Sequence, residues 1–151
     1  MSEYIRPALA AVTAVITKYS PDLLAAIERP PFAEYGRVFT GQLKNPPSLW
    51  VMPARTQLGE EGTFLKQQSI VTLKLGLVAG EPELLVDLVL DYVRAVTDAI
   101  FMADPGDDWG PSILRVFPQV HDYGPLYEKG HTFARFPEVH LVIDHAEVEP
   151  Q

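Results

Sequence analysis

The segment that most constrains the fold is residues 81–103, which the sequence predicts to be one long helix. Pro82 stands where a helix tolerates a missing N–H, and Asp104-Pro105-Gly106 cannot continue the helix. At about 100° per residue, the charged side chains fall in one arc of roughly 80°, and nearly all of the remaining surface is apolar. The charged arc consists of Glu83, Asp87, Asp91, Arg94 and Asp98.

The apolar surface of this helix is too large for one sheet to cover. A helix that packs against a sheet needs an apolar stripe only a little over about 100° wide. We therefore expect a second helix, or another subunit, to cover the remainder. The same reasoning predicts a chain that associates with copies of itself or with a partner protein.

The strand at residues 69–78 leads into this helix. Val71, Leu73, Leu75 and Leu77 alternate with a more mixed set of residues, which is the period-two pattern of a strand covered on one face. Similar patterns predict strands elsewhere in the chain. They lie at residues 35–42, 48–56, 113–117 with an extension to 121, 131–135 and 138–145.

The N-terminal region, residues 1–29, is predicted to hold two helices. Apolar residues recur at spacings of three and four from residue 4 to residue 18, and Ser20-Pro21-Asp22 is a start signal for a second, short helix. The order of elements predicts one α+β domain over residues 1–151. In it, a mostly antiparallel sheet of about five strands packs against the N-terminal helix and the one long central helix.

Two segments are expected to be mobile. Residues 57–66 contain two glycines and two adjacent carboxylates, and we interpret them as a mobile hairpin flap. Loops of this length in compact domains are usually functional or disordered. The last residues, 146–151, form a polar tail that is expected to fray.

Charge and composition narrow the function. The chain has no Cys, and 20 acidic against 12 basic residues give a formal net charge of −8. The lack of Cys excludes thiolate metal sites, disulfides and a Cys nucleophile. The acidic balance argues against tight nucleic-acid binding, which needs a basic face. Without a signal peptide or an apolar run of the ~20 residues that cross a bilayer, a soluble protein made in a cytoplasm is expected.

The titratable residues predict neither a metal site nor a catalytic site. The four histidines lie in the final third of the chain, and no pair has the three- or four-residue spacing of ligands on a helix. The aspartates of the long helix can pair with Arg94, and those at residues 104–108 lack the closing Glu of a calcium loop. No nucleophile or phosphate-loop motif is present either. The sequence therefore predicts no catalytic residue, no metal, no cofactor and no enzymatic activity.

Bulky aromatic side chains in loops are the best candidates for an interface. Phe64 lies on the flap, Trp109 follows two aspartates, and Tyr123 and Tyr127 flank a Gly-Pro turn. Interfaces favour these residue types, although packing onto the chain's own core explains them equally well. The candidate partner-interface residues are Glu60, Glu61, Phe64, Leu65, Trp109, Tyr123 and Tyr127.

Several segments together have a familiar layout. They are the N-terminal helix, the strand Pro-Ser-Leu-Trp-Val-Met-Pro at residues 47–53, the Gly- and Glu-rich flap, the alternating strand before the long helix, and the final Glu-Val-His-Leu-Val-Ile at residues 138–143. In this order the chain resembles the tail terminator and tail completion (head–tail joining) proteins of long-tailed bacteriophages. The resemblance is one of order and pattern and covers most of the chain.

This resemblance implies a structural virion protein. It implies a homo-oligomeric ring, commonly a hexamer, that caps the finished tail tube and presents a surface to the head–neck connector protein. The tail tube protein and the connector would be the partners, and DNA would pass through the lumen without specific binding. Assembly would take place in the cytoplasm of a bacterial host, and the flap at residues 57–66 would order against a neighbouring subunit.

Two other functions fit the sequence. Another neck or adaptor component of the same particle differs from a tail terminator only in location, and the residue pattern does not separate the two. A small-molecule-binding α+β module is the alternative from a different class. Its pocket would lie between sheet and helix, near Tyr92, His121 and Tyr123.

Overall fold

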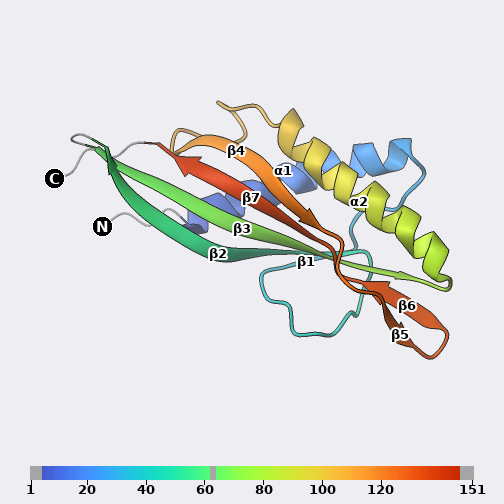
Figure 1. Cartoon of the computed structure of the whole chain (residues 1–151). Helices are drawn as coiled ribbons and strands as arrows, with labels where there is room; N and C mark the ends of the chain where they lie inside the picture. The colour runs from blue at the N-terminus through green and yellow to red at the C-terminus, as the bar shows by residue number, and fades with distance from the viewer. Residues whose placement is uncertain (1–4, 62–63, 147–151) are drawn as a thin grey trace.

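The computed structural model describes residues 5–61 and 64–146, with side chains described outside residues 57–66 and Val120 (Figure 1). This part of the chain folds into two helices and seven strands. The helices are α1 (Ile5–Ala26) and α2 (Pro82–Met102), and the strands are β1 (Glu34–Gly36), β2 (Ser48–Glu61), β3 (Phe64–Ala79), β4 (Ile113–Asp122), β5 (Tyr127–Lys129), β6 (Thr132–Arg135) and β7 (Glu138–His145).

The strands form one sheet in which every pair but one is antiparallel. β3 is its centre, because it pairs with β2 along a long hairpin, with β7 on its other side and, near its C-terminal end, with β6. β4 lies beyond β7, β5 lies beyond β6, and β1 runs parallel to the first residues of β2. The predicted α+β class is confirmed, with seven strands among the described residues in place of about five.

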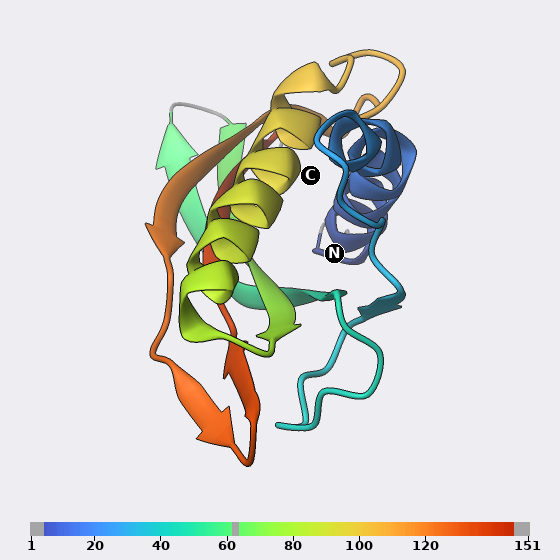
Figure 2. The same ribbon diagram turned by 90° about the vertical axis from the view of Figure 1, so that its right-hand side faces the viewer.

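Both helices lie on the same face of the sheet (Figure 2). That face carries the alternation predicted for β3, since Val71, Leu73, Leu75 and Leu77 are all buried. Directly opposite residues of antiparallel strands point to the same side, so both neighbours of β3 add apolar residues to this layer. They are Leu49 and Val51 of β2 and Val139, Leu141 and Ile143 of β7.

Neither helix of residues 5–61 and 64–146 is long and apolar enough to cross a bilayer.

The N-terminal region forms a single helix, which corrects the prediction of two. α1 contains Pro21 in its interior, although a proline there removes a backbone hydrogen bond. Ile16 and Leu24, on either side of Pro21, are both fully buried. Core packing therefore holds the two halves in one helix. α1 is followed by Glu28, whose φ of 60° turns the chain away from the helix axis.

The segments between helices and strands differ most from the predictions. The strand predicted at residues 35–42 is reduced to β1, and residues 37–47 form an irregular loop. The flap predicted at residues 57–66 belongs to a β-hairpin whose strands are longer than predicted, because β2 and β3 extend into it and pair from Gln57↔Gln68 to Glu61↔Phe64. Its mobility and its ordering against a neighbour stay predictions. Apart from Ala146, the predicted tail lies outside the described residues.

Candidate interaction surfaces

α2 is covered by its own chain on one side only. The sheet and α1 bury its inner side, which includes Leu85 and Val89. Val86, Leu90 and Phe101 follow one another along the outer side, with exposed fractions of 43%, 48% and 66%. We call these three residues the outer stripe. α1 thus supplies the predicted second helix, and the outer stripe stays exposed.

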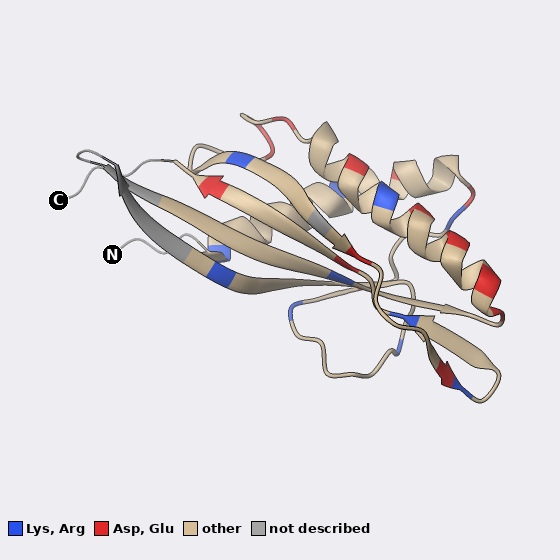
Figure 3. Ribbon diagram, viewed as in Figure 1, with Lys and Arg blue, Asp and Glu red and all other residues tan. Residues whose placement is uncertain are grey.

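Most of the net charge of the chain is also on α2 and the turn that follows it (Figure 3). Residues 81–108 contain eight Asp or Glu and one Arg, so this segment carries −7 of the formal net charge of −8. Asp91 pairs with Arg29 at 2.9 Å, and Asp98 pairs with Arg94 at 3.6 Å. Asp108 in the turn pairs with Lys18 at 2.9 Å. The carboxylates without such a pair leave the outer side of α2 acidic, and a surface of one sign repels a second copy of itself.

The opposite face of the sheet has a groove of about 1110 Å³. One wall is the loop at residues 37–47, and the other is the β5–β6 hairpin with the connection before it. Lys74 and Val78 of β3 form part of the floor. These two residues alternate with the buried residues of β3, so the groove lies on the side away from α1 and α2. In Figure 1 this loop is drawn below the sheet and α2 above it.

Four aromatic rings pack together beside this groove. The ring centroid of Phe136 lies 4.9 Å from that of Phe39 and 5.8 Å from that of Tyr127. The rings of Phe39 and Trp50 are 4.9 Å apart. The Lys74 ammonium lies 4.5 Å from the centre of the Phe39 ring, within the range of a cation–π interaction. The groove therefore has a packed aromatic side with a defined shape.

Charged groups border the aromatic cluster. The Lys74 ammonium donates to Glu138 Oε2 at 3.3 Å, and His140 Nε2 lies 3.0 Å from Glu138 Oε1. Because these three groups satisfy one another, they form a fixed polar edge. The other charged residues that line the groove are Lys44, Lys129, Asp122 and Glu128.

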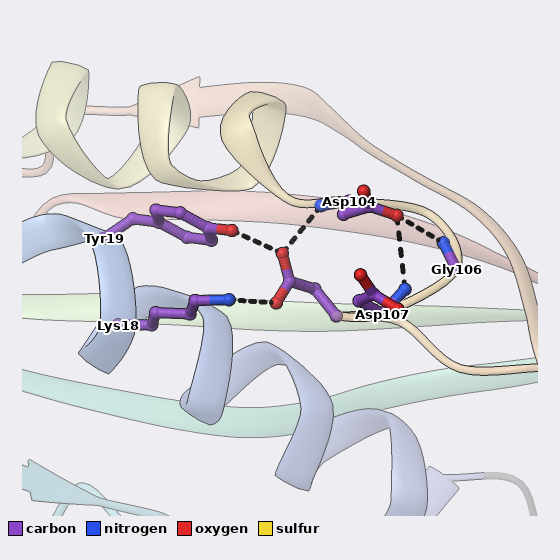
Figure 4. Close-up of polar contacts among 6 residues, drawn as sticks. Lys18, Tyr19, Asp104, Gly106 and Asp107 are labelled. Carbon is purple, nitrogen blue, oxygen red and sulfur yellow. Dashed lines mark hydrogen bonds and ion pairs between the residues drawn. The ribbon is translucent and has the colours of Figure 1, made fainter.

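The aspartates after α2 form a structural turn (Figure 4). The Asp108 carboxylate accepts hydrogen bonds from Tyr19 Oη at 2.6 Å, from the Asp104 N–H at 2.7 Å and from Lys18 Nζ at 2.9 Å. These donors lower the pKa of Asp108 to about 2. The Asp104 carboxylate accepts from the Gly106 N–H. The cluster ties the end of α2 to α1. Among the described residues, no group of three or more His, Cys, Asp or Glu could hold a metal ion.

Ser69 and His145 have the geometry of a nucleophile and its base, but they lie in the core. Ser69 Oγ is 2.8 Å from His145 Nε2 and 3.0 Å from Thr56 Oγ1. Both residues are at most 2% exposed. Burial lowers the pKa of His145, and the Asp144 carboxylate opposes that shift. A neutral imidazole with no route for a substrate serves as a structural hydrogen-bond partner.

Tyr92, His121 and Tyr123 do not form the pocket predicted for a small molecule. Tyr92 is buried, its hydroxyl donates to the Pro30 carbonyl at 2.6 Å, and burial raises its pKa to about 12. His121 Nε2 lies 3.2 Å from Thr97 Oγ1 on α2. Tyr123 is 41% exposed in the connection after β4. The three side chains thus lie in three different environments.

The predicted interface residues also lie in different places. Tyr127 is 53% exposed and lines the groove. Tyr123 is exposed as well, and the two residues that follow it, Gly124 and Pro125, line the groove. Trp109 is only 7% exposed, so it packs in the chain's own core, where the Asp104–Asp108 turn places it. The interface role of these residues stays a prediction. The remaining four lie at the β2–β3 hairpin tip, where side chains are outside the described part of the chain: Glu60, Glu61, Phe64 and Leu65.

Comparison with known proteins bears on the fold. No protein-family model and no curated protein matches the sequence. Among solved structures, 26 chains match. One of them is part of a virion. It comes from a structure described as "Virion of native gene transfer agent (GTA) particle", with a TM-score of 0.55 and 14% sequence identity over 91% of this chain and 94% of that chain. At this identity the likeness shows a shared fold.

The groove is the feature that sequence reasoning missed. Its walls come from residues 37–47 and 122–136, which no local pattern brings together. One signal was available in Gly76, because an isolated glycine inside a strand marks a close approach of another group. A Cβ at that position would lie 2.8 Å from the Trp50 ring and 2.6 Å from Leu43.

Proposed function

We propose that this chain is a structural virion protein, a tail terminator whose copies form a ring, commonly a hexamer. The ring caps the tail tube and joins it to the head–neck connector. It assembles in the cytoplasm of a bacterial host, and DNA passes through its lumen without specific binding. The function requires no catalytic residue, cofactor or metal.

The fold likeness is the observation that carries this proposal. It extends over 91% of this chain and 94% of a chain from a gene transfer agent virion. A likeness over nearly all of both chains supports a role of the whole domain, rather than a shared local motif. The sequence resemblance to tail terminator proteins points to the same kind of particle.

The surface of the molecule supports ring formation. The outer stripe leaves large apolar side chains in solvent, and exposed apolar patches mark protein–protein contacts. The acidic balance of the chain as a whole suits a particle through which DNA passes, because a net negative charge disfavours the binding of phosphates.

Deleting the gene tests the role in assembly. A tail tube without its cap continues to grow, so electron micrographs should show overlong tubes and heads without tails. Tails of normal length that do not join heads would assign the chain to another neck component instead. Normal particles that carry both head and tail would overturn the proposal.

Light scattering on the purified chain tests ring formation. We expect a mass of several subunits, either alone or with the tail tube protein. A strict monomer at every concentration that also leaves the tail tube protein unbound would contradict the proposal. The result separates a ring-forming protein from a monomeric binding module.

A small-molecule-binding module is the second candidate, and the groove is the observation that favours it. Its 1110 Å³ exceeds slightly the range of about 300–1,000 Å³ that is common for ligand sites. A ligand that binds only the folded chain raises its melting temperature. A thermal-shift screen with metabolites should therefore give no specific hit if the chain is a tail terminator, and a saturable hit would favour the module.

A further inference from the structure

The charge on α2 restricts how two copies can meet through the outer stripe. Residues 81–108 carry a formal charge of −7. A symmetric dimer contact would place the same patch of both copies face to face, so two strongly acidic surfaces would be pressed together. Repulsion between the two acidic surfaces therefore favours a head-to-tail contact, in which the outer stripe meets a different surface on the neighbouring copy.

The groove has the properties that such a surface needs. It has a packed aromatic side formed by Phe39, Tyr127 and Phe136, which suits apolar side chains such as those of the outer stripe. The groove is lined by three lysines and three carboxylates, so its formal charges cancel and the acidic helix meets little net repulsion there.

Individual charges also match across the two surfaces. Glu83 and Asp87 stand three positions before Val86 and Leu90, which places them beside the outer stripe. Neither carboxylate has an ion-pair partner among the described residues. In the groove, the same holds for the amino groups of Lys44 and Lys129. Asp122 and Glu128 also line the groove, so the match is local: the helix carboxylates would approach Lys44 and Lys129.

The long free edges of the sheet, along β2 beyond β1 and along β4, are weaker candidates for a contact between copies. β2 contains Pro53, and β4 contains Pro118. Each strand also has a register shift next to its proline. Proline and bulges are the means by which edge strands avoid pairing with another chain. A contact between faces is therefore favoured over pairing of edges.

We propose that the outer stripe of one subunit packs into the groove of the next subunit. The two surfaces lie on opposite sides of the sheet, so the contact repeats in one direction from copy to copy. A head-to-tail contact of this kind closes into a ring when the rotation between neighbours allows it. The proposal rests on the ring of the proposed function and names the two surfaces that build it.

Cross-linking between introduced cysteines tests this contact, because the natural chain has no Cys. Leu90→Cys and Tyr127→Cys place one thiol on each surface, at positions that are 48% and 53% exposed. With a short bismaleimide, the double variant should give a ladder of covalent oligomers. A mixture of the two single variants should give covalent dimers. Each single variant alone should give no cross-linked product.

A matched control uses Leu114→Cys with Tyr127→Cys, because Leu114 is 66% exposed on β4 and lies outside both surfaces. This pair should give no ladder. A ladder of equal yield from the control pair, or dimers from Leu90→Cys alone, would overturn the proposed contact. No ladder from a double variant whose parent chain is a ring by light scattering would overturn the contact and leave the ring. A chain that stays monomeric, leaves the tail tube protein unbound and forms no ladder would overturn both.

Discussion

Replacing Gly76 by Ala tests how the aromatic cluster beside the groove is packed. A Cβ at this position would lie 2.6 Å from Leu43 Cδ1, 2.8 Å from Trp50 Cη2 and 2.9 Å from Trp50 Cζ3. The Leu43 side chain can rotate away, but the indole cannot, because its ring packs against Phe39 with a centroid distance of 4.9 Å. Gly76→Ala therefore forces the cluster to shift.

The size of the effect follows from two opposing contributions. Overpacking a core typically costs about 1–3 kcal/mol. Alanine inside a strand recovers roughly 0.5–1 kcal/mol of backbone entropy relative to glycine. Subtracting the central values leaves a net loss of about 1 kcal/mol in the free energy of unfolding, which corresponds to a melting temperature lower by roughly 2–4 °C for a chain of this length.

Chemical denaturation monitored by Trp fluorescence measures this loss. Gly80→Ala is the matched control, because nothing lies within 4 Å of its added Cβ and its φ is not positive. It should leave the free energy of unfolding unchanged or slightly raised. Trp50→Leu removes the clash, so Gly76→Ala should cost little more in that background. A Gly76→Ala variant as stable as the wild type would refute the packing described for the indole.

The remaining predictions concern stability and pH. Glu28 has a left-handed φ of 60° at the end of α1, where the Arg29 N–H bonds to the Leu24 carbonyl at 2.9 Å. Glycine is the residue best suited to that position, so Glu28→Gly should raise the free energy of unfolding by about 0.5–1 kcal/mol in urea denaturation; a decrease would contradict this. The pKa of Asp108 is lowered from 3.8 to about 2, so its contribution to stability is present above pH 3.8 and is lost as the pH falls through about 2. An Asp108→Asn variant should lack this part of the acid unfolding curve. Burial lowers the pKa of His145 from 6.5, so its contribution is full above pH 6.5 and is lost as the pH falls below that value. His145→Gln should flatten the stability profile below pH 6.5, and an unchanged slope there would refute the assignment of a buried neutral ring.

The regular elements could be predicted because their burial repeats with a fixed period. The alternation of β3 and β7 and the broad apolar surface of α2 are properties of local sequence, and the structure places these elements within a few residues of the predictions. Local signals for the start and end of a helix were less reliable predictors. Ser20-Pro21 has the pattern of a helix start, but the burial of Ile16 and Leu24 keeps α1 continuous.

The candidate surfaces also include one that could be predicted from a local period and others that depend on tertiary contacts. The exposed outer stripe follows from the helical period of α2, so the sequence predicted that this helix needs a further partner. Trp109 has the pattern of a surface loop residue, but the hydrogen bonds of the Asp104–Asp108 turn fold it onto the core. The groove depends on contacts between Phe39 and Phe136, nearly 100 positions apart, and such tertiary contacts are not encoded in any period or motif.

The central claim is that the outer stripe of α2 is a contact between subunits. Sedimentation velocity tests it most directly, with the wild type compared with Leu90→Asp and with Leu114→Asp, which also adds one negative charge at an exposed leucine. In the condition in which light scattering shows the ring, with the tail tube protein added if the ring needs it, we predict that the wild type and Leu114→Asp sediment as the same closed oligomer, whereas Leu90→Asp does not assemble. Identical sedimentation of all three proteins would contradict the claim.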